Sequence, residues 1–224
     1  MPCVSYIVGL ALGQMSDFAA LALLKVNDAG GYSERLTFDV TYLHRWRIGT
    51  PYTKIAEGAA KMLVDEPFKS TGSRTTLAID ASEAGRPIIT IFENARLRAN
   101  IVPITITGGH TAQADAGGHL VPKQILVSTL QLVLQTGRLK VASKLPESKT
   151  LTQELQNYQL SPTERINDIY EGRRGAQDGL ILAVAVALWV ETFAQVRVTD
   201  EEREVFRKIL PGAGVKRKVY GYDY

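Results

Sequence analysis

Two aspartates occupy positions where α/β proteins commonly carry reactive groups. Asp80 follows the apolar run Thr75–Ile79, which is typical of a strand, and Asp178 precedes the apolar run Leu180–Val190, which is typical of a buried helix. Side chains at the ends of central strands converge at one edge of a sheet, and the helix dipole stabilises a carboxylate at a helix start. Both residues are therefore candidate site carboxylates. The alternatives are a turn former at Asp80 and a helix cap at Asp178.

Other catalytic patterns are missing from the sequence. It contains no G-x-x-x-x-G-K-[ST] and no G-x-G-x-x-G, which excludes a P-loop ATPase site and argues against a nucleotide cofactor. It has no G-x-S-x-G nucleophile elbow. His44, His110 and His119 lack the spacing of a zinc site. The single cysteine, Cys3, excludes an internal disulfide framework and fits a reducing cytoplasm.

Length and composition indicate an ordinary globular protein. The 224 residues favour one domain over residues 1–224, with about 200–224 as a C-terminal extension. Hydrophobic residues make up 45% and charged residues 22%, which excludes a disordered or fibrous chain. The net charge of +3 is compatible with nucleic acid but too small to argue for it. No signal peptide is predicted, and Leu180–Val190 is too short to span a bilayer.

The first third of the sequence predicts strands. Apolar runs at Val4–Leu12 and Phe18–Val26 precede an alternating run, Arg35–Trp46, in which every second residue is apolar. Short turns between these runs imply an antiparallel meander. A helix then follows to Val64, with Thr50 as its N-cap and Pro51 as its first residue.

Strands and helices alternate in the rest of the chain, which favours a mixed central sheet with helices on its faces. We expect strands at Thr75–Ile79, Ile101–Thr107 and Leu139–Val141; helices at Gly85–Arg98, from Pro122 to a stop at Gly137, at Leu151–Tyr158 and at Asp178–Phe193; and connections at Asp65–Ser73, His110–His119 and Pro162–Gly175. This order is also the order of the ribonuclease H-like fold.

Seven stretches, in the right order, resemble the nuclease domain of the large subunit of tailed-phage terminases. With the apolar helix to Trp189 that follows the last stretch, the similarity runs from about residue 5 to residue 195, which is nearly the whole chain. The stretches are Tyr6–Gln14, Gly49–Tyr52, Leu77–Ala81 with Gly85–Pro87, Ile104–Gly109, Val121–Lys123, Leu134–Lys140 and Gly175–Leu180.

This resemblance implies a ribonuclease H-like α/β fold and metal-dependent cutting of double-stranded concatemeric DNA during genome packaging. The family places metal-binding carboxylates at the ends of the first and fourth strands and at the start of the last helix. By position these are Ala11, Asp80 and Asp178, so that Asp80 and Asp178 would bind two Mg²⁺ or Mn²⁺ ions. The implied partners are double-stranded DNA, a terminase ATPase domain or small subunit, and a portal, in the host cytoplasm and without a membrane.

The sequence departs from the family pattern at the site itself. Ala11 stands where the family has an aspartate, and Gln177-Asp178-Gly179 replaces a motif that often reads His-Asp-Asp. An alanine offers no ligand, and the strand carboxylate normally bridges two metal ions about 3.5–4 Å apart. An engineered substitution would explain Ala11 alone, whereas natural divergence also explains the second departure. Asp17 and Glu83 are candidate replacements for the missing carboxylate.

Three hypotheses follow from the sequence. The first is an endonuclease with impaired activity, in which basic residues contact DNA phosphates. The second is a catalytically inactive module of the same fold that binds DNA or packaging components. The third is an unrelated ribonuclease H-like enzyme, against which the Val121–Lys123 and Leu134–Lys140 stretches argue. The candidate phosphate contacts are Lys123, Arg138, Lys140, Arg173 and Arg174.

Overall fold

The computed structural model describes residues 3–13, 17–28, 36–65, 68, 75–82, 85–115, 117–159 and 178–194. Within them, one eight-stranded sheet has the order β6-β7-β5-β4-β1-β2-β3-β8. The strands are β1 (Cys3–Ala11), β2 (Ala20–Asp28), β3 (Leu36–Arg45), β4 (Thr75–Asp80), β5 (Ala99–Thr107), β6 (Gln113–Asp115), β7 (Gly118–Pro122) and β8 (Leu139–Val141).

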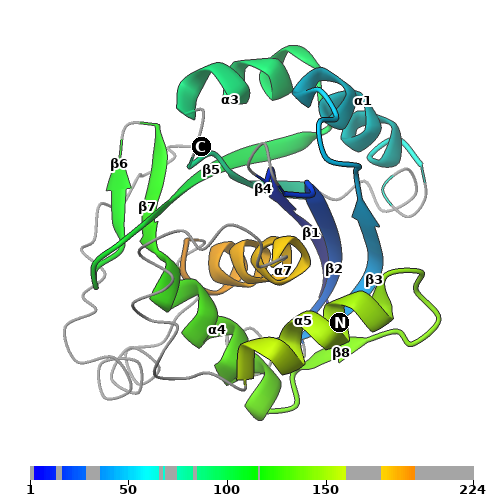
Figure 1. Ribbon diagram of the computed structural model, residues 1–224, viewed down its shortest axis with the longest axis vertical. Helices are drawn as coiled ribbons and strands as arrows, with labels where there is room; N and C mark the ends of the chain where they lie inside the picture. Colours follow the sequence, from blue (N-terminus) through cyan, green and yellow to red (C-terminus); the bar gives the residue numbers. More distant parts are fainter. Residues whose placement is uncertain are drawn as a thin grey trace.

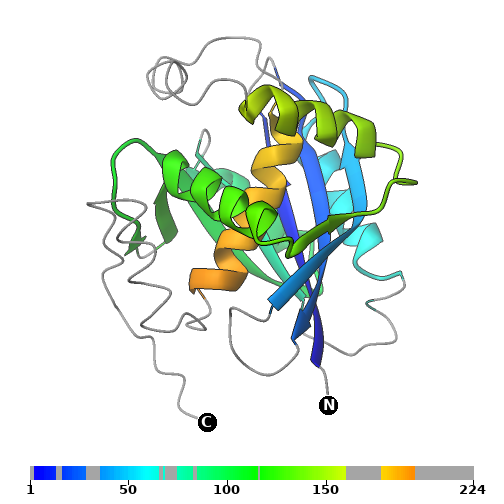
Figure 2. The same ribbon diagram turned by 90° about the horizontal axis from the view of Figure 1, so that it is seen from below.

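The helices form a layer on each side of the sheet. The sheet curves around α7, and α1 and α3 cover its outer face (Figure 1). Seen from below, α7 (orange) runs beside α4 (green) and α5 (yellow-green) (Figure 2). The helices are α1 (Tyr52–Met62), α3 (Gly85–Asn94), α4 (Lys123–Gln135), α5 (Ser148–Gln159) and α7 (Gly179–Trp189), which continues as a π-helical turn, Val190–Ala194.

β1, β2 and β3 form the antiparallel meander that the sequence predicts. β4 adds in parallel beside β1, and β5 adds in parallel beside β4, so that the sheet is mixed, as expected. Three antiparallel strands followed by parallel strands, with a helix in the curve of the sheet, make the fold ribonuclease H-like.

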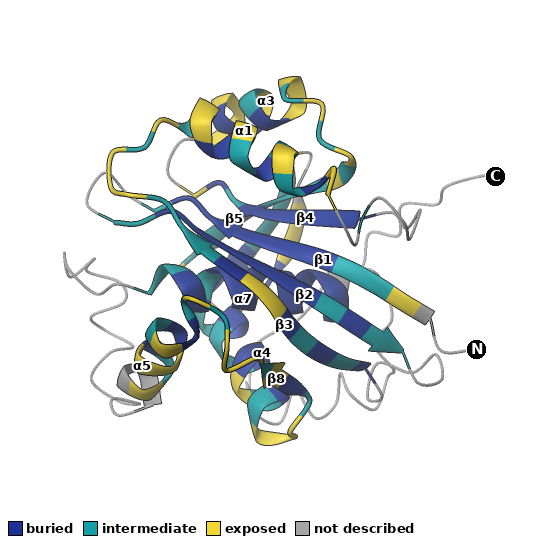
Figure 3. Ribbon diagram, turned by 90° about the vertical axis from the view of Figure 1, so that its right-hand side faces the viewer, coloured by how far each residue is buried: buried dark blue, intermediate teal, exposed yellow. Residues whose placement is uncertain are grey.

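Alternation along the strands divides the core between the two faces. Ile7 and Ala11 of β1 and Ala78 of β4 belong to the cluster around α7. Val8 and Leu77, one residue out of phase, belong to the cluster beneath α1 and α3. Most of the central strands are buried on both faces (Figure 3), which explains their continuous apolar runs.

Helix α7 lies unusually close to the sheet. A Cβ atom built on Gly9 would be 1.8 Å from the carbonyl oxygen of Ala183, so only glycine permits this approach. Apart from its first residue and Leu182, every residue of α7 is buried, which confirms the predicted buried helix. No helix among the described residues is long and apolar enough to cross a membrane.

Three local predictions are wrong. The predicted connection His110–His119 contains a hairpin of β6 and β7, whose strands are too short and polar to show periodicity. Thr50 does not cap α1, because its hydroxyl donates to the carbonyl of Arg47 at 2.6 Å and Pro51 takes the N-cap position. Helix α3 ends at Asn94 rather than Arg98. The predicted connection Pro162–Gly175 and the extension 200–224 lie outside the described residues.

Candidate active site

The ends of two central strands place Ala11 directly beside Asp80. β1 and β4 are parallel, and their register pairs Ala11 with Asp80 at the last position of the ladder. Ala11 belongs to the α7-side cluster, and Asp80 is two residues beyond Ala78, which belongs to the same cluster. Because side chains alternate along a strand, both positions face α7. Ala11, where the resemblance implies a carboxylate, is therefore adjacent to the carboxylate of Asp80.

Helix α7 brings Asp178 to the same edge of the sheet. Gly179, its first residue, packs so closely that an added Cβ would lie 3.0 Å from the Phe18 carbonyl oxygen and 3.2 Å from Ala20 Cβ. Ala20 in turn pairs with Ala11. The three family positions thus meet at the edge where β1 and β4 end and β2 begins.

Asp178 occupies the N-cap position of α7, but its side chain makes no capping hydrogen bond. Its Oδ2 instead accepts from the Lys123 ammonium, Nζ to Oδ2 2.9 Å, in an ion pair whose side chains are 23% and 19% exposed. Asp178 is therefore the N-cap residue, as the simpler interpretation expects, but its carboxylate pairs with Lys123 and does not cap the helix. Lys123 reaches this edge because it follows β7, which runs parallel to β5 and ends beside it.

Asp80 is held by the backbone turn that follows it. Its Oδ1 accepts from the Ser82 amide at 3.0 Å and also from the Ser82 hydroxyl. The same hydroxyl accepts from the Ile106 amide of β5 at 2.7 Å. Asp80 thus forms a turn, as the simpler interpretation expects, and this turn also fixes its carboxylate at the sheet edge.

A further carboxylate, Asp17, lies within electrostatic range of Asp178. Burial raises the pKa of Asp17, the negative charge of Asp178 raises it further, and Lys123 acts in the opposite direction. Of the two candidate replacements for the missing acid, Asp17 is thus near the site, while Glu83 lies outside the described residues.

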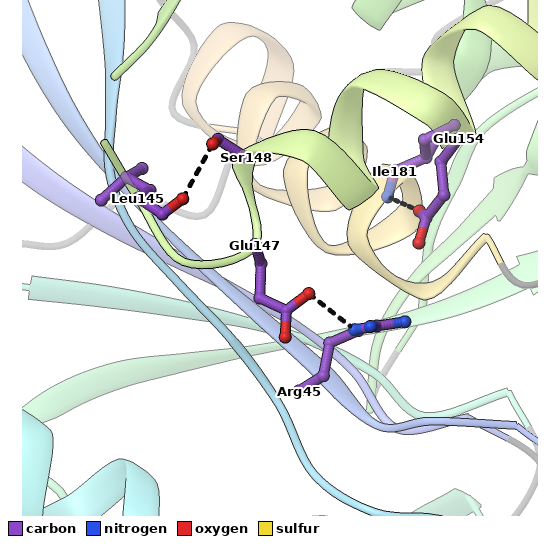
Figure 4. A network of polar contacts seen from close by, with 6 residues as sticks. All are labelled: Arg45, Leu145, Glu147, Ser148, Glu154 and Ile181. Atoms are coloured by element: carbon purple, nitrogen blue, oxygen red, sulfur yellow. Dashed lines mark hydrogen bonds and ion pairs between the residues drawn. The ribbon is translucent and has the colours of Figure 1, made fainter. Parts of the chain in front are cut away.

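Glu154 of α5, which no sequence motif singles out, accepts a hydrogen bond from the first turn of α7. Its Oε2 accepts from the Ile181 amide at 3.1 Å (Figure 4), although Glu154 is only 7% exposed. Burial raises its pKa to about 7, with Asp178 adding to the effect and Arg45 opposing it. One feature of the sequence does indicate that Glu154 is buried. It lies three residues after the buried Leu151, and therefore on the same face of the helix.

Arg45, at the end of β3, also borders this region. Its Nε pairs with Glu147 at 3.1 Å (Figure 4), and its guanidinium lies 4.9 Å from the centre of the Phe18 ring.

Of the predicted phosphate contacts, only Lys123 is placed at the candidate site. Lys140 lies in β8, which pairs with Phe38–Val40 near the start of β3, whereas the site lies at the edge where β3 ends. Arg138 immediately precedes β8, and its Nε donates to the Thr136 hydroxyl at 3.0 Å. Arg173 and Arg174 lie outside the described residues.

The donor set does not fit a two-metal centre. Ala11 provides no ligand, Asp178 is paired with Lys123, and Asp80 accepts from Ser82. In the part of the chain that the structure describes, no three His, Cys, Asp or Glu side chains are grouped so that they could hold a metal ion.

Among comparisons with known proteins, only the comparison with solved structures gives a match, and it supports the fold class. No protein-family model matches the sequence, and no curated protein matches it. Several solved structures match this chain over most of its length and most of their own. Because the sequence identities are low, these matches establish the fold alone.

Two of these structures are nuclease domains of terminases. The large terminase nuclease from thermophilic phage G20c is 18% identical, with a TM-score of 0.50 over 82% of this chain and 81% of that chain. The human cytomegalovirus terminase nuclease domain, in a Mn-soaked structure, is 12% identical, with a TM-score of 0.52 over 85% of this chain and 84% of that chain. The chain therefore has the fold of terminase nuclease domains, as the sequence resemblance implies.

Proposed function

We propose that the chain is a DNA endonuclease of the terminase type whose cleavage is weakened at one position. The observation that carries this proposal is the meeting of Asp80 and Asp178 beside Ala11, at one edge of the sheet and on its α7 face. The terminase nuclease fold of the chain supports the same reaction and double-stranded DNA as substrate. An ATPase domain, small subunit or portal as partner belongs to this proposal, as does a cytoplasmic location.

Divalent cations belong to this proposal for two reasons. The family that the chain resembles depends on them, and Mg²⁺ and Mn²⁺ prefer carboxylates such as Asp80 and Asp178 as ligands. A cytomegalovirus relative was studied with Mn. The residues of this chain do not fit the full two-metal arrangement, because the position of the bridging carboxylate is Ala11. We therefore expect attenuated activity and assign no reaction step to a second metal ion.

The chain's own residues hold the two carboxylates in place. Ser82 fixes Asp80 to the turn after β4, and Lys123 fixes Asp178 at the start of α7. Both groups are thus oriented before DNA binds, which lowers the cost of arranging a site during the reaction.

A second function, a DNA-binding module without cleavage, is favoured by one specific observation. Lys123 neutralises the Asp178 carboxylate, with Nζ 2.9 Å from Oδ2, and Ala11 beside Asp80 carries no charge. This edge of the sheet is therefore less negative than one with three free carboxylates. It attracts metal ions less and repels DNA phosphates less.

Plasmid cleavage with Mg²⁺ and with Mn²⁺ separates the two functions. The chain is compared with Ala11→Asp, with the matched neutral variant Ala11→Asn, and with Asp178→Asn. We expect slow cutting by the chain, at least about tenfold faster cutting by Ala11→Asp because a metal-binding carboxylate returns, and no gain from Ala11→Asn. Asp178→Asn should abolish cutting.

Loss of folding is checked by thermal melting, because Ala11 is only 2% exposed. If neither the chain nor a folded Ala11→Asp variant cuts while both retard DNA in a gel, the endonuclease proposal is wrong and the binding module replaces it.

A further inference from the structure

Arg45 ends β3 at the same edge of the sheet as the candidate active site. The strand register pairs Arg45 with Ala20 of β2, and Ala20 with Ala11 of β1. Neighbouring strands lie about 4.8 Å apart, so the backbone of Arg45 is about 10 Å from that of Ala11. Leu43, two residues earlier in β3, belongs to the core cluster around α7. Because side chains alternate along a strand, Arg45 faces α7, as Ala11 does.

Two contacts hold the Arg45 guanidinium and leave its outer end available. Its Nε lies 3.1 Å from Oε2 of Glu147 (Figure 4), and the group lies 4.9 Å from the centre of the Phe18 ring. A guanidinium has five N–H donors, and Nε provides one of them. Within the described part of the chain, no hydrogen bond engages the four donors of Nη1 and Nη2. These two amino groups can therefore donate to a further acceptor.

A half-buried guanidinium with unused donors is well suited to a phosphate group. The Arg45 side chain is 20% exposed, so that it reaches the surface, while water screens its charge less than that of a fully exposed cation. The N–H groups of a guanidinium lie in one plane and can donate two parallel hydrogen bonds to phosphate oxygens. A lysine ammonium at the same place would act only as a point charge.

The charges around Arg45 do not cancel its attraction for an anion. Glu147 engages it through a single nitrogen. Glu154 also acts on it electrostatically, but burial raises the pKa of Glu154 to about 7, so that this carboxyl group is only partly ionised at neutral pH. Lys123, by contrast, has its ammonium paired with Asp178 at 2.9 Å. Of these two cations at the edge, Arg45 is thus the one with donors to spare.

We propose that Arg45 binds a DNA phosphate on the β3 side of the candidate site, with Nη1 and Nη2 donating to two oxygens of one phosphate group. Lys123 follows β7, on the other side of Asp80 and Ala11 in the strand order, so that the two cations flank the strand ends. At 3.4 Å of helix axis per nucleotide, the separation of about 10 Å between Arg45 and Ala11 corresponds to about three nucleotides. Arg45 thus contacts a different phosphate from the one nearest Asp80. This inference rests on the proposed function, because duplex DNA as substrate comes from it.

Binding of a short DNA duplex, measured by fluorescence anisotropy with EDTA present, tests the inference. The full chain is compared with Arg45→Gln, with Arg45→Lys and with the matched control Lys54→Gln, which removes one positive charge from α1, on the outer face of the sheet (Figure 1). We expect Arg45→Gln to bind at least about fivefold more weakly, with the slope of log affinity against log salt concentration smaller by about one. Arg45→Lys should keep the slope but bind at least about twofold more weakly, because the paired hydrogen bonds are lost. Lys54→Gln should stay within about twofold of the wild type.

Glu147→Gln separates phosphate binding from a purely structural role of Arg45. A glutamine oxygen can still accept from Nε but carries no negative charge. If Arg45 contacts a phosphate, this variant should bind the duplex at least about twofold more tightly, because the charge that opposes the phosphate is gone. A residue that only stabilises the fold through Glu147 would give no such gain.

Two results would overturn the inference. One is an unchanged affinity and salt slope in an Arg45→Gln variant that thermal melting shows to be folded, and the other is a loss in Lys54→Gln as large as that in Arg45→Gln. If Arg45→Gln does not fold, Glu147→Gln decides, and an unchanged or weaker affinity in that variant contradicts the inference.

Plasmid cleavage by the same proteins tests the proposed function separately. If the chain cuts DNA but Arg45→Gln binds the duplex as the wild type does, the inference alone fails. If Arg45→Gln loses affinity as expected but neither the chain nor Ala11→Asp cuts, the endonuclease proposal fails and the phosphate contact of Arg45 stands.

Discussion

Two carboxylates, Asp178 and Glu154, lie at the start of α7, and only Glu154 accepts a backbone N–H of its first turn. An aspartate at an N-cap normally accepts a backbone N–H of the first turn, yet Asp178 gives its carboxylate to Lys123. The first turn of α7 is served by Glu154, from a different helix. The Asp178 carboxylate is thus held at the sheet edge instead of bending back over its own helix.

The role of Glu154 makes a pH-dependent prediction. Its pKa in the folded chain is about 7, above the ordinary value of 4.5, because burial disfavours the charged form. The folded state therefore binds the proton more tightly than the unfolded state, and its stability falls as pH rises from about 4.5 to about 7. Urea unfolding at pH 5 and pH 8 should show this loss, on the order of 2–3 kcal/mol.

Glu154→Gln should remove that part of the pH dependence, since an amide oxygen can still accept from Ile181 but does not titrate. The matched control is Glu93→Gln, at an exposed carboxyl of α3, which should keep the wild-type profile. An identical pH dependence in Glu154→Gln and the wild type would show that Glu154 does not carry the effect.

At the scale of elements, the contact between β1 and α7 determines where the site forms. The start of α7 touches the beginning of β2, and its middle touches Gly9 of β1. The helix therefore cannot slide along the sheet without a clash at one of these contacts. This fixed register keeps Asp178 level with the strand ends.

Gly9→Ala tests the importance of this close approach. The new methyl group would be 1.8 Å from the Ala183 carbonyl oxygen, so that α7 must move away from the sheet. We expect a loss of at least about 2 kcal/mol in unfolding free energy, measured by urea denaturation, and a loss of any plasmid cleavage.

Gly117→Ala is the matched control, because an added Cβ there meets only the end of the Arg86 side chain, at 3.6 Å. Its stability should stay within about 0.5 kcal/mol of the wild type. A Gly9→Ala variant as stable as this control would mean that α7 is not held by the contact.

The sequence was sufficient for elements with a strong local signal. The meander follows from alternation and short turns, the α4 helix from its periodicity and its stop at Gly137, and the buried α7 from its continuous apolar run. The β6–β7 hairpin was missed because β6 has three residues, and what stabilises it is pairing with β5 through β7, a contact distant in sequence.

The candidate site was predictable only in part, for a similar reason. Asp80 and Asp178 stand out because each adjoins a long apolar run. The contacts of Lys123 and Glu154 join residues 55 and 27 positions apart, and no local pattern specifies them. The place of Ala11 beside Asp80 depended on the family resemblance, and the strand register supplies the physical reason.

At the scale of the whole molecule, α4 separates Lys123 from two other basic residues, Arg138 and Lys140. Lys123 begins the helix at the site, and Arg138 and Lys140 follow its other end, next to β8. With a rise of 1.5 Å per residue, the helix spans about 20 Å. A phosphate bound near Asp80 and Asp178 therefore lies beyond the reach of Arg138 and Lys140.

Their contribution to DNA binding can be measured on a short duplex by fluorescence anisotropy, with EDTA present so that no DNA is cut. If the duplex lies over the edge formed by Asp80 and Asp178, the double variant Arg138→Gln/Lys140→Gln should bind within about twofold of the wild type and keep the salt dependence, because no phosphate contact is lost. Lys123→Gln should bind at least about fivefold more weakly, because Asp178 then repels the DNA without an ammonium beside it. A loss in the double variant as large as that in Lys123→Gln would instead place the DNA along α4, from the site to β8, and would make the basic residues at both ends of the helix parts of one continuous binding surface.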